Sequence, residues 1–267
     1  MSLFYLLIVA IVQGITEFLP VSSSGHLILL PFFLGTHDQG QAIDVAVHVG
    51  TLGAVILYFW RDVKIGLAGL PRLMTGRTDT PGSKLAFLLI VATIPVILIG
   101  LILKVTGLAD AMRSPAVIGW TMLIFGLALY WFDQKGAEMK GEADWNLKDA
   151  IKLGLWQAVA LIPGTSRSGI TITGARAMGY TRADAAKISM LMSIPTIMAS
   201  GILLGAEVVG DADWAMLKDA AIGAVFAFGA ALLALTLMMR LLKSVSFTPY
   251  VIYRVILGVI LLGISYS

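Results

Sequence analysis

The sequence reads LPVSSSGH at residues 19–26 and IPGTSRSG at residues 162–169, and each stretch interrupts a long apolar region. These apolar regions cover residues 3–34 and 150–175, and each break leaves flanks of about 12 residues. A helix needs about 20 residues to cross a bilayer. Broken backbone at membrane depth is tolerated only where it is buried in protein or lines a polar cavity. We therefore predict two re-entrant helix–loop–helix hairpins.

The composition indicates that lipid surrounds the rest of the chain. Of 267 residues, 58% are hydrophobic and only 13% are charged, against about 25% charged residues in soluble domains. The net charge of +3 is too small and dispersed for nucleic-acid binding. The absence of cysteine excludes a disulfide framework and a thiol nucleophile. An ordinary water-soluble enzyme and a nucleic-acid-binding protein are both disfavoured, and the expected partner is the membrane bilayer.

Six further apolar stretches are long enough to span a membrane. They cover residues 42–60, 85–105, 115–133, 186–207, 217–241 and 249–266. The predicted fold class is therefore an all-α integral membrane protein with six transmembrane helices and two re-entrant hairpins. We expect residues 1–267 to form a single polytopic membrane domain.

The two interrupted regions resemble each other. Gln13 and Gly25 are 12 positions apart, as are Gln157 and Gly169, and serine-rich chain lies between the members of each pair. We predict two pseudo-repeats, residues 1–140 and 141–267, each with one hairpin and three spans. Chance similarity between apolar segments is the alternative interpretation.

The distribution of charge predicts an orientation, because Lys and Arg prefer cytoplasmic loops. The basic loops are 61–84, 134–152 and 240–248, whereas 35–41, 106–114 and 207–219 are poor in basic residues or acidic. Placing the basic loops inside requires each hairpin to return to the side that it entered. Three spans per half then make the halves inverted relative to each other, with both termini outside.

The second helix of each hairpin is expected to begin within a serine-rich break. Serine is a good N-cap, and free backbone N–H groups at a helix N-terminus attract anions. Arg167 adds a guanidinium that can bind phosphate through two hydrogen bonds. The predicted phosphate-binding residues of this pocket are Ser22, Ser24, Gly164, Ser166, Arg167 and Ser168.

Four residues of the first break supply candidate reactive groups. Gln13 and Glu17 share one helix face, and an ionisable residue in apolar sequence is usually functional. Ser23 is a candidate nucleophile if Glu17 or His26 accepts its proton, and His26 is itself a candidate base, acid or nucleophile. Gln13 and Glu17 could also bind Mg²⁺ or Ca²⁺ together with phosphate oxygens. Structural roles for Glu17, His26 and the serines are the competing interpretation.

The motifs QGITEFLPVSSSGH at residues 13–26 and PGTSRSG at residues 163–169 resemble the undecaprenyl-diphosphatase family of the bacitracin-resistance type. The resemblance extends over essentially the whole chain. It implies a bacterial inner-membrane enzyme that removes the terminal phosphate of undecaprenyl diphosphate and regenerates the monophosphate carrier for cell-wall glycan synthesis. The polyprenyl diphosphate lipid is then the expected partner.

The resemblance also implies roles for individual residues. Ser23 and His26 match the reactive hydroxyl and imidazole of the family, while Ser166, Arg167 and Thr171 match its phosphate-binding motif. Gln13 stands where many members have glutamate, which weakens the case for a metal site with two carboxylates.

Two functions follow as expectations. One is a phosphatase whose catalytic residues are Glu17, Ser23, His26 and Arg167, with a site that opens to the periplasmic side. The alternative is a transporter or flippase for the polyprenyl phosphate lipid, because inverted repeats with discontinuous helices are typical of transporters. A homodimer is one possible assembly.

Overall fold

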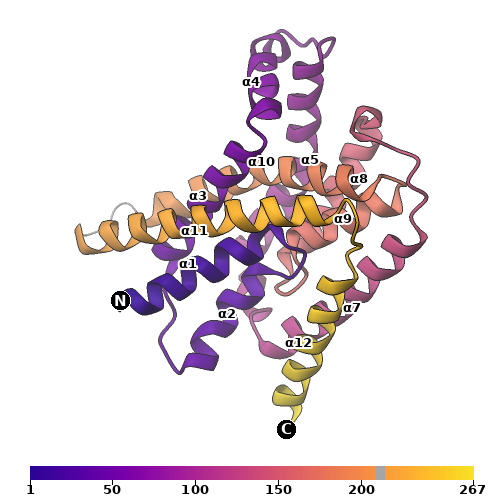
Figure 1. Cartoon of the computed structure of the whole chain (residues 1–267). Coiled ribbons are helices and arrows are strands. Elements are labelled where there is room, and N and C mark those ends of the chain that lie inside the picture. The colour runs from indigo at the N-terminus through magenta and orange to yellow at the C-terminus, as the bar shows by residue number, and fades with distance from the viewer. Residues whose placement is uncertain (209–213) are drawn as a thin grey trace.

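The computed structural model describes residues 1–208 and 214–267, without the side chains of residues 109–110 and 206–208. Helices dominate the described residues, and the only β-structure among them is an isolated bridge between Lys140 and Tyr180. Figure 1 shows the arrangement. The elements are α1 (Leu3–Phe18), α2 (Ser23–Leu34), α3 (Gln41–Tyr58), α4 (Trp60–Met74), α5 (Pro81–Thr106), α6 (Leu108–Ala111), α7 (Pro115–Lys135), η1 (Glu142–Asp144), α8 (Leu147–Ala158), η2 (Val159–Leu161), α9 (Arg167–Ala177), α10 (Arg182–Val208), α11 (Trp214–Leu241) and α12 (Thr248–Tyr266).

Six helices in the described part of the chain are long and apolar enough to cross a membrane: α3, α5, α7, α10, α11 and α12. They coincide with the six predicted spans to within a few residues at each end. The predicted multi-pass, all-helical architecture is therefore confirmed. The side chain of Glu207 and residues Asp211 and Asp213, which contribute to the acidic character of the predicted loop 207–219, lie outside the described residues.

The predicted loop 61–84 connects two spans as expected, but it contains helical structure that the sequence analysis did not predict. Residues 61–84 contain most of α4 and the first turn of α5, and this pair of helices projects from the body of the molecule (Figure 1). The two helices pack closely because Gly69 and Gly82 have no side chains. A Cβ atom on Gly69 would overlap the backbone of Gly82, and one on Gly82 would overlap the carbonyl oxygen of Ile65. α4 is short and of mixed polarity, so the length of apolar sequence does not reveal it.

The two predicted breaks are present as interruptions between short helices. The first break separates α1, of 16 residues, from α2, of 12. The second separates α8, of 12 residues, from α9, of 11, with η2 and a turn between them. Each of these helices is shorter than the roughly 20 residues that a bilayer crossing requires.

Small residues bring the long helices together, as is common where helices associate in lipid. α11 packs against both α1 and α3. A Cβ atom on Gly50 of α3 would overlap the carbonyl oxygen of Ala224 of α11, and one on Gly14 of α1 would lie 2.7 Å from the carbonyl oxygen of Ala227. These glycines set the separation between the helices that surround the first break.

The three basic segments lie at one end of the molecule, which we call the basic end and define by residues 61–84, 134–152 and 240–248. Lys187 at the start of α10 contacts Asp62 of α4 at 2.7 Å and Glu142 of η1 at 2.6 Å. The backbone N–H of Phe247 donates to the Asp133 carboxylate at the end of α7, at 3.2 Å.

Contacts at the other end join the remaining segments. The N-terminal ammonium of Met1 lies 3.5 Å from Asp219, and Arg113 lies 3.9 Å from Asp38. The basic loops and the loops that are acidic or poor in basic residues thus lie at different ends of the molecule.

The close contact at Gly50 generates a prediction. Gly50→Ala should lower the free energy of unfolding by about 1–3 kcal/mol, because the added methyl group cannot be accommodated without moving α3 from α11. Thermal unfolding in detergent measures this change. Gly229→Ala on α11 is the matched control, since a Cβ atom there meets nothing within 4 Å. Equal melting temperatures for the two variants would contradict the packing described for Gly50.

Candidate active site

The two breaks meet each other inside the molecule. Arg167, the first residue of α9, donates from Nη2 to Oε1 of Glu17 near the end of α1, at 2.7 Å. Ser168 Oγ donates to the backbone carbonyl of Leu19 at 3.0 Å. Residues 150 positions apart in the sequence therefore share one site.

Both breaks use the same capping geometry. Ser22 and Ser166 have φ angles of 74° and 71° and are the only non-glycine residues with positive φ in the described ranges. Their hydroxyl oxygens accept from the backbone N–H groups of Gly25 and Gly169, at 3.3 and 3.1 Å. Positive φ is costly for a residue with a Cβ atom and persists where surrounding structure enforces it. The two second helices are thus started in the same way.

Glu17 is the centre of the polar network. Its Oε2 atom accepts from Ser23 Oγ at 2.6 Å and from Gln13 Nε2 at 3.0 Å, while Oε1 accepts from Arg167. His48 Nε2 of α3 lies 3.8 Å from Oε2. The Glu17 side chain is only 6% exposed, and charge-assisted donors are what a buried carboxylate needs to remain ionised. The arrangement holds a hydroxyl beside a carboxylate and a guanidinium.

The hydrogen bonds of His26 indicate its tautomer. Nδ1 lies 2.7 Å from the backbone carbonyl oxygen of Ser22, which can only accept, so this nitrogen carries a proton. Nε2 of a neutral ring then accepts from the Tyr253 hydroxyl of α12, at 2.5 Å. The two rings are also stacked, with 5.7 Å between their centroids. Ser23 is therefore paired with Glu17, whereas His26 is paired with Tyr253.

Arg254 of α12 is a site residue that the sequence analysis missed. It is fully buried, and its guanidinium donates to carbonyl oxygens in both breaks: Pro20 at 3.4 Å, Gly164 at 3.2 Å and Thr165 at 2.9 Å. None of the carboxylates that the structure describes is paired with it. A single arginine within the apolar stretch 249–266 was the available signal, because intramembrane charges are usually functional.

Several predicted phosphate ligands already have partners in the protein. Ser22, Ser166, Ser168 and Thr171 are buried, and Thr171 Oγ1 lies 2.6 Å from Ser189 Oγ of α10. Ser24 is exposed at the first turn of α2. The roles of these residues in phosphate binding stay predictions.

Gly164, the remaining predicted ligand, packs against α7. Its φ is 86°, and a Cβ atom there would overlap Thr121 Oγ1. The close approach of the second break to α7 therefore explains why a glycine occupies this position. Binding of phosphate by the Gly164 backbone stays a prediction.

The region around Glu17 partly matches what a divalent cation requires. Oε1 of Gln13 is buried and has no hydrogen-bond partner among the described residues, so an amide oxygen is available beside the carboxylate. No group of three or more His, Asp or Glu residues that could hold a metal occurs in the described part of the chain. Mg²⁺ often uses one or two protein oxygens and completes its coordination with water and substrate phosphates. Gln13 and Glu17 fit this kind of site only when a phosphate ligand is also present.

The fold and the site together define a multi-pass helical membrane protein in which a buried carboxylate contacts a hydroxyl and a guanidinium at the junction of two broken helices. Residues 6–260 match the model of the family described as bacitracin resistance protein BacA, and the chain belongs to this family.

Curated relatives share the full length of the chain. It is 72% identical to the undecaprenyl-diphosphatase of Ruegeria pomeroyi and 72% identical to that of Jannaschia sp., over 100% of both chains in each comparison. Undecaprenyl-diphosphatase 1 of Rhodospirillum rubrum is 44% identical, over 100% of this chain and 96% of the relative.

The position of Arg254 leads to a prediction about folding. Arg254→Met should lower the free energy of unfolding by about 2–4 kcal/mol, because it removes the donors of several buried carbonyl groups. Amide hydrogen exchange around residues 163–166 should also become faster. Arg240→Met is the control, since Arg240 is exposed at the end of α11. If Arg254→Met were as stable as the control, Arg254 would not hold the breaks together.

Proposed function

We propose that this protein is a membrane-embedded phosphatase that hydrolyses undecaprenyl diphosphate to undecaprenyl phosphate and inorganic phosphate. The contact of Ser23 and Arg167 with the same buried carboxylate, Glu17, is the observation that carries the proposal. Relatives named undecaprenyl-diphosphatase at 65–72% identity over the full chain support the same substrate. The product is the lipid carrier that cell-wall synthesis reuses.

Ser23 is the proposed nucleophile. Its hydroxyl already donates to Glu17 Oε2, which accepts the proton as Ser23 Oγ attacks the terminal phosphorus. The bond from this phosphorus to the bridging oxygen breaks, and undecaprenyl phosphate leaves. Water then attacks the phosphoserine, releases inorganic phosphate and restores the Ser23 hydroxyl.

Arg167 and the N-terminus of α2 are proposed to bind the charge of the diphosphate. Arg167 can move a guanidinium N–H from Glu17 to a phosphate oxygen, and Ser23 and Ser24 lie where free N–H groups begin α2. Catalysis of phosphoryl transfer is mainly positioning and electrostatic stabilisation. Partial exposure of Ser23 and His26, and exposure of Ser24, give the headgroup access at this turn.

His26 is proposed to act in the second step. It lies three residues after Ser23 on α2, so both side chains share one face of the helix. Its unprotonated Nε2 atom can accept a proton from the attacking water once Tyr253 moves from it. The pairing of Ser23 with Glu17 favours serine over histidine as the nucleophile.

A divalent cation, Mg²⁺ or Ca²⁺, is proposed to bind together with the substrate. Glu17 and the free Oε1 atom of Gln13 would hold it, and the diphosphate would supply further oxygen ligands. When bound, the cation would neutralise charge on the diphosphate. The assay of phosphate release therefore includes a chelator arm.

The paired breaks are proposed to be re-entrant hairpins of an inverted repeat, with pseudo-repeats 1–140 and 141–267. The packing supports this: α1 packs against α11, and α8 packs correspondingly against α5. Gln13 and Gln157, at matching positions, are both buried and each retains an Oε1 atom without a partner among the described residues. A flippase would also use such a repeat, but it would have no need for a nucleophile beside a base.

Removal of either charged residue should abolish phosphate release. Glu17→Ala and Arg167→Ala are each expected to lose at least about 100-fold in rate, because each removes charge stabilisation or proton acceptance. Released inorganic phosphate is measured with purified protein, undecaprenyl diphosphate and a divalent cation in detergent. The controls are Asp38→Ala and Arg113→Ala, which remove charges from a partly exposed ion pair at the end of the molecule opposite the basic end. Full activity of either site variant would overturn the proposed site, and inactive wild-type protein would favour transport.

The proposed orientation places the basic end in the cytoplasm of a bacterial cell, the site opening outward and both termini outside, in the inner membrane. The clustering of basic segments at one end supports it. A homodimer stays a prediction for which size measurement in detergent is the test.

Labelling of single cysteines checks this orientation, because the natural chain has none. Asp38→Cys should react with a membrane-impermeant maleimide on intact spheroplasts, whereas Lys148→Cys should react only after lysis. The opposite pattern would reverse the topology. The predicted outer loop 106–114 offers a second position for such a label, Asp110, whose side chain lies outside the described residues.

A further inference from the structure

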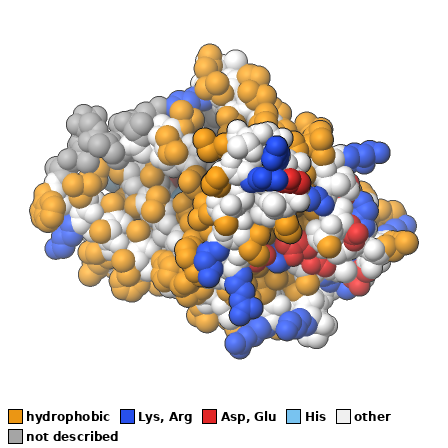
Figure 2. Space-filling view, turned by 90° about the horizontal axis from the view of Figure 1, so that it is seen from above, with side chains coloured by type: hydrophobic (Ala, Val, Ile, Leu, Met, Phe, Trp, Pro, Cys, Tyr) orange, Lys and Arg blue, Asp and Glu red, His pale blue; other side chains and the backbone are white. Residues whose placement is uncertain are grey.

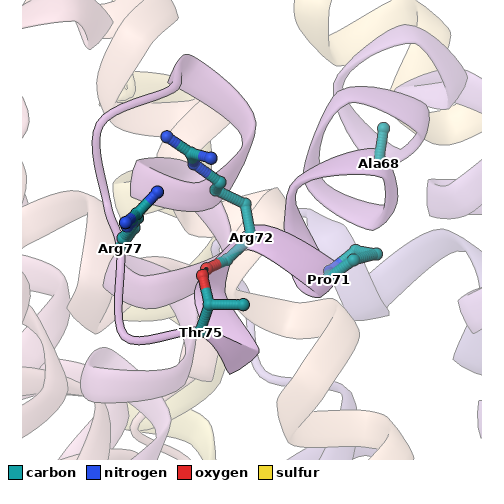
Figure 3. A pocket seen from close by; sticks show the side chains of 5 residues that line it. All are labelled: Ala68, Pro71, Arg72, Thr75 and Arg77. Carbon is teal, nitrogen blue, oxygen red and sulfur yellow. Dashed lines mark hydrogen bonds between the residues drawn. The ribbon is translucent and has the colours of Figure 1, made fainter.

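The turn between α4 and α5 carries a surface pocket remote in sequence from the Glu17 site. Ala68, Pro71, Arg72, Thr75 and Arg77 line it. Figure 3 shows the guanidinium groups of Arg72 and Arg77 extending to the same side of the turn. Two guanidinium groups lining one pocket favour a phosphate-bearing ligand.

The pocket is held by a rigid support. The close contact between Gly69 and Gly82 fixes α4 against α5. Thr80 and Ser83 form a reciprocal capping box at the start of α5. The turn that carries both arginines therefore has a defined shape before any ligand binds.

The two arginines differ in their partners. Arg72 donates to the Asp79 carboxylate from Nε, at 2.9 Å, and from Nη2, and these hydrogen bonds lower the pKa of the Asp79 carboxyl. Arg77 is exposed and has no ion pair or side-chain hydrogen bond with any residue that the structure describes. Asp79 therefore orients Arg72 and offsets its charge, while the charge of Arg77 is left without a partner among the described residues, so the pocket retains a positive charge.

An apolar stripe runs along α4 beside the pocket. Leu67, Leu70 and Met74 are spaced as one helix face and are 55%, 37% and 88% exposed. Figure 2 shows Lys and Arg side chains among hydrophobic ones on the face that carries this turn. A helix with apolar and basic surfaces side by side is typical of the boundary between lipid headgroups and acyl chains.

We propose that this pocket binds the phosphate of an anionic phospholipid, with Arg72 and Arg77 on the headgroup and the acyl chains along Leu67, Leu70 and Met74. A bilayer lipid is favoured over a soluble phosphate because the exposed apolar stripe lies on the helix face next to the basic pocket. α5, against which α4 packs, is itself an apolar candidate span. The inference is independent of the proposed phosphatase activity and fits the cytoplasmic leaflet, where anionic lipids attract basic segments.

Native mass spectrometry of the full chain in neutral detergent tests the site. The wild-type protein is titrated with phosphatidylglycerol, with zwitterionic phosphatidylcholine as the comparison. Arg72→Gln/Arg77→Gln should weaken the tightest phosphatidylglycerol binding by roughly tenfold, since each basic residue near anionic lipid contributes substantially to binding. Lys148→Gln/Lys243→Gln is the matched control, because it removes the same charge from exposed positions at the same end.

The outcomes separate the alternatives. Preferential loss of phosphatidylglycerol in the arginine variant, with unchanged melting temperature and phosphate release, supports the proposal. Equal loss in both double variants shows only a general effect of charge and overturns it. Equal binding of the two lipids by the wild-type protein, or displacement of the lipid by millimolar inorganic phosphate, also overturns it.

Discussion

The ion pair between Glu17 and Arg167 is the interaction on which the centre of the molecule depends. It joins the end of α1 to the start of α9 at 2.7 Å, in surroundings that leave little water around either group. A buried charge without a partner is costly, so each residue requires the other. Because each is located beside a break, the pair also determines where the two interrupted helices meet.

The breaks create a second requirement, which Arg254 meets. Backbone that leaves a helix exposes carbonyl groups, and lipid offers them no hydrogen bonds. Arg254 donates to the carbonyls of Pro20 and Gly164, one from each break. The hydroxyl oxygens of the serine caps accept hydrogen bonds from N–H groups at the start of the helices that follow. The polar chemistry at the centre is possible because the surrounding groups satisfy the interrupted backbone.

Much of this structure was accessible from the sequence because lipid imposes simple rules. Apolar length revealed the six spans, and interruption of that length revealed both breaks and brought Glu17, Ser23 and Arg167 into consideration. The same rules overlooked α4, whose 15 residues mix Lys64 and Arg72 with apolar positions. Arg254 was marked only by its place as a single arginine in an apolar stretch, because its partners are backbone carbonyls, which leave no pattern in a sequence. The pairing of Ser23 with Glu17 follows only from the folded structure, since the sequence places both Glu17 and His26 within reach of that hydroxyl.

The common capping geometry of the two breaks separates what the proposed halves share from what distinguishes them. At matching positions Ser22 and Ser166, Ser24 and Ser168, and Gly25 and Gly169 are identical, and these residues build the frame. The reactive positions differ: Ser23 corresponds to Arg167, and His26 to Ile170. A symmetric pair of identical halves would present two hydroxyls or two guanidiniums, never one of each. In the proposed repeat, the two halves thus share a capping frame and contribute different reactive groups to a single asymmetric site.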